Sequence, residues 1–149
     1  MGKPASSSLR LFTIMEPIPL LHNKRIVLGV AGGIAAYKTA DLASKLTQAG
    51  AQVDVVLTEA AAKFVGPVTF AAVTARAALT DADLWRPDQH VPHVQLGESA
   101  DLMIIAPATA NTIAKLAHGQ ADNLLTIVAL AARCPIILAP AMDGGMWLN

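Results

Sequence analysis

The sequence predicts a doubly wound α/β fold, which is a mostly parallel sheet with helices on both faces. Short runs of aliphatic and β-branched residues recur along the chain, and each is long enough for one strand. Helical segments separate these runs, so that strands and helices alternate. The runs are apolar almost throughout, which is typical of parallel strands that are buried on both faces.

The first two elements are a strand and a long helix. Residues 25–31 (RIVLGVA) form a continuous β-branched and aliphatic run, which predicts a buried strand. Residues 34–49 predict a helix because Leu42 and Leu46 fall on one helical face. Gly50 is suited to end that helix.

The next segment predicts a strand followed by two short helices. Residues 52–57 (QVDVVL) form the second strand run, and Thr58 is suited to cap a helix over TEAAAKF. A Gly-Pro step then predicts a helix over residues 67–73. The pattern fades over residues 75–91, where we expect a loop.

The last third repeats the alternation. Residues 101–106 (DLMIIA) predict a third strand, and residues 109–117 predict a helix that ends near His118-Gly119. Residues 124–133 form a strongly apolar helical segment. Residues 135–139 (PIILA) predict a fourth strand, closed by a proline.

Composition limits the function classes. The chain has 149 residues, 54% hydrophobic and 15% charged, with a formal net charge of zero. It carries no long basic run, so no nucleic-acid partner is expected, and no apolar stretch of about 20 residues, so no membrane span is expected. A single cysteine, Cys134, forms no internal disulfide and fits a cytoplasmic location.

The chain divides into an extension and one domain. Glu16, Pro17 and Pro19 interrupt the apolar residues of segment 1–23, which we expect to be a loosely ordered extension and not a signal peptide. Residues 24–149 are the length of one ordinary domain. The sequence stops directly after a motif with no closing helix, so we expect this domain to be truncated at its C-terminus.

Parallel α/β folds bind ligands at the carboxyl ends of their strands. The loop after the first predicted strand, GVAGGIAAYK, places Gly32 and Gly33 ahead of a helix, where backbone N–H groups can hold a phosphate. Its spacing matches neither G-x-G-x-x-G nor the nucleotide P-loop. A tight turn that only packs helix on strand is the alternative.

Polar side chains follow the second and third predicted strands. The Thr58 hydroxyl could bind phosphate or ribityl oxygens, although a simple helix cap is the alternative. Glu59 is compatible with an alternative class, the nicotinamide-dependent enzymes, in which an acidic residue near this position binds the ribose of the cofactor. The PATANT loop brings Thr109, Asn111 and Thr112 together, which is more polar capacity than a cap needs.

The fourth loop, PAMDGGMW, offers soft apolar surface from Met142 and Met146 and one carboxylate from Asp143.

His93 lies in HVPHVQLGESAD, ahead of the third predicted strand, and a lone histidine is more often structural than catalytic. No Cys/His cluster with ligand spacing is present, so no metal site is expected. Cys134 is interpreted as core packing.

Four segments in this order, GGIAAYK, HVPHVQL, PATANT and PAMDGGMW, resemble the homo-oligomeric flavin-containing cysteine decarboxylases. The resemblance covers residues 24–147 and is strongest to the branch that acts on 4′-phosphopantothenoylcysteine in coenzyme A biosynthesis. It implies a Rossmann- or flavodoxin-like flavoprotein domain that forms a homotrimer or a larger homo-oligomer. It also implies, in many members, a fused ligase domain.

The resemblance implies FMN as the cofactor and decarboxylation as the reaction. The thiol-bearing carbon is oxidised, the carboxylate leaves as carbon dioxide, and the enethiol is reduced to give 4′-phosphopantetheine. His93 matches the acid–base histidine of the family. The residues implied to hold the phosphate, the ribityl chain and the ring edge are Gly32, Gly33, Ile34, Thr58, Thr109, Ala110, Asn111, Thr112 and Ala141.

The sequence departs from the family pattern at two points. Asp143 stands where the family has an asparagine that binds the substrate carboxylate, and an anionic side chain would repel that group unless protonated or turned away. The family's clamp cysteine would lie beyond Trp147, and Cys134 cannot replace it. An FMN-binding module without decarboxylase activity and a flavin prenyltransferase are therefore the alternative functions.

Overall fold

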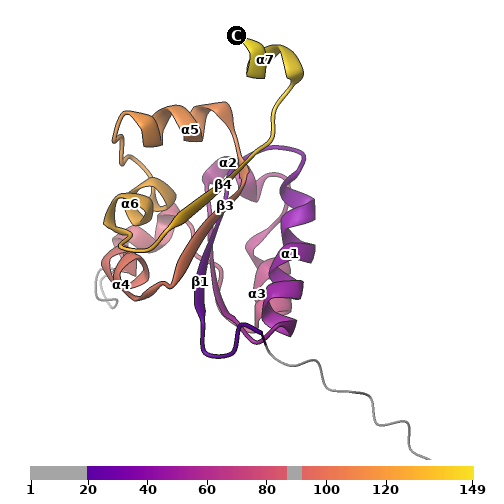
Figure 1. Cartoon of the computed structure of the whole chain (residues 1–149), viewed down its shortest axis with the longest axis vertical. Coiled ribbons are helices and arrows are strands. Elements are labelled where there is room, and N and C mark those ends of the chain that lie inside the picture. Colours follow the sequence, from indigo (N-terminus) through magenta and orange to yellow (C-terminus); the bar gives the residue numbers. More distant parts are fainter. Residues whose placement is uncertain (1–19, 87–91) are drawn as a thin grey trace, which may run out of the picture.

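The computed structural model describes residues 20–86 and 92–149, and it has a four-stranded, all-parallel sheet in the order β2-β1-β3-β4 (Figure 1). This arrangement confirms the doubly wound fold. The chain moves outward from β1 to β2, then crosses back to β3 and β4. The strands are β1 (Arg25–Val30), β2 (Gln52–Leu57), β3 (Leu102–Ala108) and β4 (Ile136–Pro140).

Helices cover both faces of the sheet. On one face lie α1 (Ala36–Gln48) and α3 (Pro67–Thr74), and on the other lie α4 (Pro92–Ser99) and α6 (Leu124–Ala131) (Figure 1). The remaining elements lie at the loops: α2 (Glu59–Ala62), the 3-10 helix η1 (Asp81–Trp85), α5 (Ala110–Ala117) and α7 (Gly144–Leu148).

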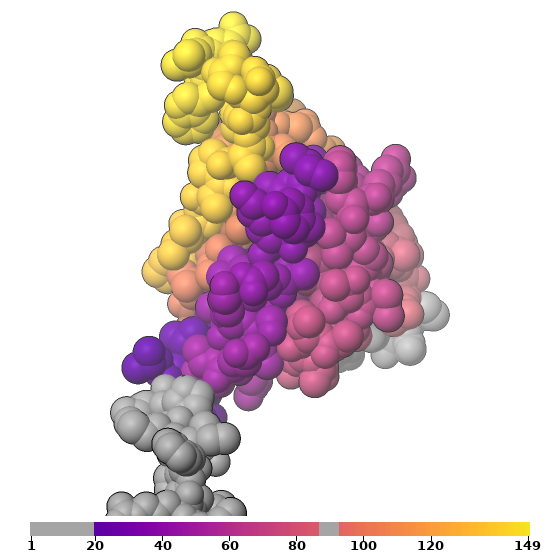
Figure 2. All heavy atoms as spheres, turned by 90° about the vertical axis from the view of Figure 1, so that its right-hand side faces the viewer, coloured from indigo at the N-terminus to yellow at the C-terminus, as the bar shows by residue number. Residues whose placement is uncertain are grey.

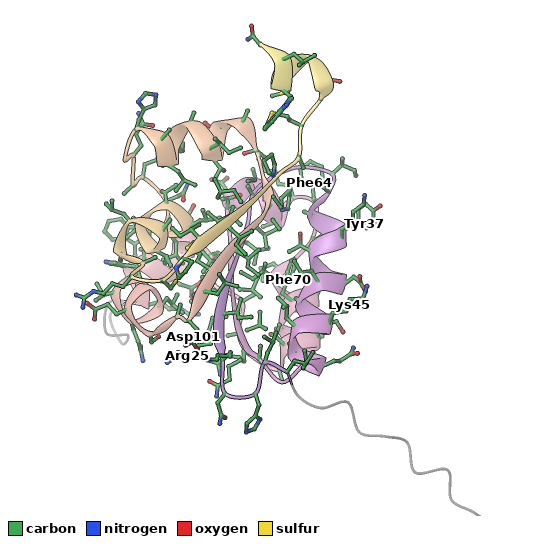
Figure 3. All side chains as sticks on the ribbon, viewed as in Figure 1. Arg25, Tyr37, Lys45, Phe64, Phe70 and Asp101 are labelled. Atoms are coloured by element: carbon green, nitrogen blue, oxygen red, sulfur yellow. The ribbon has the colours of Figure 1, made fainter. Side chains whose placement is uncertain are left out.

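The core consists of two apolar clusters, one on each face of the sheet. Alternate residues of β1 point to opposite faces, so Leu28 belongs to the cluster under α1 and α3, whereas Val27 belongs to the cluster under α6. Phe70 of α3 is fully buried between the sheet and α1 (Figure 3). Leu124 and Leu125 of α6 fill the opposite cluster.

The sequence prediction was incomplete between β2 and β3. Within the loop predicted for residues 75–91, a 3-10 helix forms at Asp81–Trp85, and Leu79 pairs with Val56 of β2. Residues 87–91 lie outside the described residues. The helix α4, which was not predicted, packs so closely on α6 that a Cβ at Gly97 would lie 2.8 Å from the Ala131 backbone carbon.

The expectation that all four strands are buried on both faces is wrong for β4. Strands β1 and β2 are almost entirely buried, but β4 lies at the edge of the sheet, and each of its residues is exposed. Ile136, Ile137 and Leu138 expose 38%, 52% and 38% of their surface. The continuous apolar run was compatible with an edge position, because only the spatial order of the strands decides which strand has one neighbour.

The amino ends of the strands are closed by charged side chains. Asp54 of β2 is buried and receives a 2.7 Å hydrogen bond from Arg76, and its other oxygen lies 3.6 Å from Arg25. The backbone N–H of Arg25 donates to Asp101, and Figure 3 shows both residues at the end of the sheet where β1 begins. These contacts occupy the amino ends of the strands, although the buried Nε of Arg25 has no hydrogen-bond partner among the described residues.

The N-terminal part of the described chain is anchored to this domain. The Leu21 N–H donates to the Ala49 carbonyl at 2.9 Å, and the Leu21 side chain packs against the core. The rest of the expected extension, residues 1–19, lies outside the described residues. Among the helices of residues 20–86 and 92–149, none has the length and apolarity needed to cross a membrane.

Candidate functional site

A cavity of about 970 Å³ opens at the carboxyl ends of the four strands. The loops that follow β1, β2, β3 and β4 each contribute to its lining, as expected for a parallel α/β fold. The C-terminal segment carrying α7 projects beyond the rest of the molecule at this end, where Met146 completes the lining (Figure 2).

The structure brings together every predicted site residue except His93. These residues come from segments far apart in the sequence, yet they line one cavity. They are Gly32, Gly33, Ile34, Thr58, Thr109, Ala110, Asn111, Thr112, Ala141 and Asp143. Glu59, Met142 and Met146, which the sequence also suggested, line it too.

The two glycines of the first loop have different surroundings. A Cβ at Gly32 would lie 2.3 Å from the Ala60 Cβ, so the absence of a side chain lets α2 pack against this loop. A Cβ at Gly33 would meet only the Thr109 methyl group, at 3.9 Å. Gly32 is therefore required for packing, whereas Gly33 leaves open space between the first and third loops.

Two of the three predicted threonines, Thr58 and Thr109, cap helices and also line the cavity. The Thr58 hydroxyl accepts the Ala61 N–H at 3.1 Å, and the Thr109 hydroxyl accepts the Thr112 N–H at 3.2 Å. A hydroxyl group has a donor as well as acceptor lone pairs. Capping a helix thus leaves the Thr58 hydrogen free to donate to a ligand, so the two interpretations are compatible.

Three helices of eight or more residues begin at this cavity. The N-cap residues of α1, α5 and α6 are Ala35, Thr109 and Asn123, and all three line it. Helix N-termini carry partial positive charge and unpaired N–H groups, which favour anions. The cavity is therefore suited to a ligand with at least one anionic group.

An ion pair at the cavity joins α5 to the loop before α6. The Lys115 ammonium donates to both carboxylate oxygens of Asp122, at 2.9 and 2.8 Å. This hydrogen bond holds the pKa of the Asp122 carboxyl below its ordinary value. Asp81 of η1 ties the same region to α6 by accepting the Leu124 N–H at 2.7 Å.

The carboxylate of Asp143 is engaged with its own backbone. Its Oδ1 accepts the Gly145 N–H at 2.7 Å, which makes Asp143 the N-cap of α7. The side chain lines the cavity with one oxygen directed to this cap. Asp143 therefore caps α7 and faces the cavity at the same time.

His93 lies apart from the other predicted site residues. It is the second residue of α4, on the face of the sheet covered by α4 and α6, and it does not line the cavity. Its Nδ1 is buried and has no hydrogen-bond partner among the described residues. An unpaired buried imidazole nitrogen is costly, so this atom is available for a further partner.

Several lining residues were not predicted from the sequence. Lys63, Asp81, Lys115, Asp122 and Asn123 all line the cavity. Lys115 could have been found, because it lies one helical turn after Asn111 and Thr112 and shares their face. Lys63 could have been found in the same way, because it lies one helical turn after Glu59, and Asn123 could have been found as the cap of an apolar helical run. Asp81 and Asp122 depend on tertiary packing that the local sequence does not specify. The described residues contain no group of three His, Cys, Asp or Glu side chains that could hold a metal.

Known proteins of similar sequence include bifunctional proteins of coenzyme A biosynthesis. The chain is 48% identical over 126 residues to the coenzyme A biosynthesis bifunctional protein CoaBC of Mycobacterium tuberculosis, covering 85% of this chain and 30% of that protein. It is 47% identical over 128 residues to CoaBC of Bacillus subtilis, covering 86% and 32%. The chain thus spans about a third of the length of the curated relatives it matches.

Solved structures of similar fold include FMN-dependent cysteine decarboxylases. The FMN-dependent cysteine decarboxylase SpaF superposes with a TM-score of 0.79 at 38% identity, covering 87% of this chain and 74% of that one. A C175S mutant of PPC decarboxylase complexed with pantothenoylaminoethenethiol gives 0.75 at 34% identity, covering 85% and 71%. The resemblance drawn from the four sequence motifs is confirmed. The model of the Flavoprotein family matches residues 17–149, and the chain belongs to that family.

Proposed function

We propose that this chain binds FMN in the cavity at the carboxyl ends of the strands and forms the decarboxylase part of a coenzyme A biosynthesis protein. Its substrate would be 4′-phosphopantothenoylcysteine and its product 4′-phosphopantetheine. One observation carries the proposal: residues from four separate loops, each expected to contact FMN, line a single cavity. The names of the relatives, CoaBC and PPC decarboxylase, support the reaction.

The cavity is large enough for FMN, and its loops offer contacts in the order in which FMN carries its phosphate, ribityl chain and ring. Its volume of about 970 Å³ lies within the range of small-molecule sites, about 300–1,000 Å³. Gly33, Ile34 and Thr58 would hold the phosphate beside the start of α1. Hydroxyl and amide groups at the start of α5 would hold the ribityl chain, and the Ala141-Met142 segment would border the ring.

When bound, FMN supplies the redox chemistry at the cysteine end of the substrate, and the protein orients the reacting groups. The carboxylate of Asp143, held by the Gly145 N–H, would leave room for the substrate carboxylate to depart. The imidazole of His93 would serve as the acid–base group.

For this role, His93 must reach a cavity that it does not line in its own chain. We propose that a homo-oligomer, a trimer or larger, brings His93 of one copy to the cavity of another. Exposed apolar side chains on α6 and β4 are consistent with a subunit contact: Leu130, Ile136, Ile137 and Leu138.

The greater length of the relatives supports a fused ligase domain. A thiol-bearing substrate fits a reducing, cytoplasmic location.

The second candidate function is an FMN-binding module without decarboxylase activity. Asp143 favours it, because a carboxylate stands where the family uses a neutral amide toward the substrate. A flavin prenyltransferase, which would consume FMN together with a prenyl phosphate, is the third. All three share the cavity and differ only in the reaction.

The test uses the full-length natural protein that contains this chain, loaded with FMN and supplied with 4′-phosphopantothenoylcysteine. We expect carbon dioxide release, and we expect His93→Asn to abolish release while FMN stays bound. Bound FMN without release from the unaltered protein would establish the binding module instead. Release of pyrophosphate or phosphate from a prenyl phosphate would establish the prenyltransferase.

A mixing experiment tests the proposed assembly. His93→Asn carries an intact cavity, and Gly33→Val carries an intact histidine with a filled phosphate loop. If His93 acts on a neighbouring copy, oligomers reassembled from the two inactive variants regain part of the activity. Persistent inactivity of demonstrably mixed oligomers would contradict the proposed position of His93.

A further inference from the structure

Lys63 lies one helical turn from the glycine loop, on the wall of the cavity. The segment α2 touches that loop through Ala60, which would collide with any side chain at Gly32. The Lys63 N–H donates to the Ala60 carbonyl at 3.2 Å, so both residues belong to one helical turn. Residues three positions apart share a helical face, and both Ala60 and Lys63 line the cavity.

Lys63 differs from the other lysine that lines the cavity in its ion pairing. Two lysines, Lys63 and Lys115, face four carboxylates, Glu59, Asp81, Asp122 and Asp143. Lys115 is already paired with Asp122. Lys63 makes no ion pair with any described residue, although Glu59 lies four positions before it. Lys63 is therefore the unpaired cation among the described lining residues.

A phosphate group entering this cavity meets a lining with two more carboxylates than ammonium groups. Backbone N–H groups and helix termini offset only part of that repulsion. A lysine within reach of the phosphate adds a charge-assisted hydrogen bond, the stronger class of polar contact. Lys63 lines the cavity from the turn of α2 that contacts the first loop at Gly32, so its exposed side chain extends from the segment next to that loop.

We propose that Lys63 is the counter-ion of the FMN phosphate and selects the phosphorylated flavin over riboflavin. This inference rests on the proposed binding of FMN. The glycine loop and Thr58 supply neutral donors, and Lys63 supplies the only unpaired positive side chain among the described lining residues. Its removal weakens the hold on the phosphate and leaves contacts with the ribityl chain and the ring unchanged.

The experiment compares FMN with riboflavin, which lacks the phosphate, by titration into the purified chain. In Lys63→Gln, we expect FMN affinity to fall about fivefold at low salt, the scale of a largely solvated charge pair. Riboflavin affinity stays unchanged. The FMN effect shrinks at high salt because screening weakens an exposed interaction. Lys63→Arg keeps the charge and retains most of the affinity.

Lys45→Gln is the matched control. Lys45 pairs with Asp41 on α1 and points to solvent, away from the sheet (Figure 3), so its loss leaves both affinities unchanged. Equal loss of FMN and riboflavin affinity in Lys63→Gln would overturn the inference, and so would unchanged FMN affinity at low salt. Failure of the unaltered chain to bind either flavin overturns the proposed function and this inference together.

Discussion

At the scale of single residues, the adjacent glycines Gly32 and Gly33 separate packing from ligand binding. An added methyl at Gly32 collides with Ala60, whereas one at Gly33 meets only the Thr109 methyl at 3.9 Å. The sequence motif presents both as phosphate-loop glycines. Only the structure distinguishes the glycine that α2 needs from the glycine that a ligand can approach.

We predict opposite outcomes for alanine at these two positions. Gly32→Ala forces α2 away from the loop and lowers the free energy of unfolding by about 1–3 kcal/mol, the cost of overpacking. Gly33→Ala changes the free energy of unfolding by less than about 0.5 kcal/mol, but it weakens FMN binding because the methyl occupies the space of close backbone approach.

Denaturant unfolding and FMN titration of both variants check this prediction. If Gly33→Ala binds FMN as well as the unaltered chain, the phosphate does not lie against Gly33. If Gly32→Ala unfolds with unchanged free energy, the contact with Ala60 is not structural.

The Asp122 carboxyl provides a pH prediction at the same scale. Lys115 stabilises the ionised form, so the pKa in the folded protein lies below the unfolded value. With a lowered pKa, the stabilising contribution is present above the unfolded pKa, about 3.9 for aspartate. It is lost as the pH falls through the folded pKa.

Carbon-13 NMR titration of the Asp122 side chain should therefore give a midpoint below that of an unstructured aspartate, and Lys115→Met should return the midpoint to the ordinary value. A midpoint that does not respond to Lys115→Met would show that the ion pair does not form in solution.

At the scale of elements, periodicity predicted the strands well. The second strand was predicted at its observed bounds, and the other three within two residues at each end. These runs are apolar enough to be distinctive. The cap at Thr58 was also correct, because a threonine ahead of a short alanine run specifies a local hydrogen bond.

Three elements were missed: α4, η1 and the short helix α7, which forms at Gly144–Leu148 although no closing helix was expected there. Of these, α4 depends on tertiary contacts, whereas α7 is exposed and is capped locally by Asp143. Helix α4 carries Gly97 in its last turn, and glycine disfavours an isolated helix. Here the glycine allows close contact with Ala131 of α6, and that packing stabilises the helix. The 3-10 helix did have a local signal, since Thr80 and Asp83 form a capping box.

At the scale of the whole molecule, the two ends of the parallel sheet differ: charged pairs cover the amino ends of the strands, and the cavity opens at their carboxyl ends. The pairs around Asp54 and Asp101 close the amino ends of the strands. The carboxyl ends gather ten predicted site residues around one cavity. The sequence could predict this gathering, because parallel strands direct all their following loops to one edge.

The position of His93 could not be predicted in the same way. It precedes β3 instead of following a strand, so the topology places it outside the cavity of its own chain. The exposure of β4 likewise depends on the spatial order of the strands, which leaves β4 with a strand on one side only. Both features depend on how the elements are arranged in space, and a local sequence pattern does not encode that arrangement.

The central claim is that the cavity at the carboxyl ends of the strands holds FMN, and equilibrium titration of the purified chain with FMN tests it most directly. If FMN binds there, the chain shows a flavin absorbance band in the visible, saturates at one FMN per chain, and binds more weakly in Gly33→Ala. A colourless chain that does not bind added FMN, while its unfolding remains cooperative, would show that the cavity does not hold FMN.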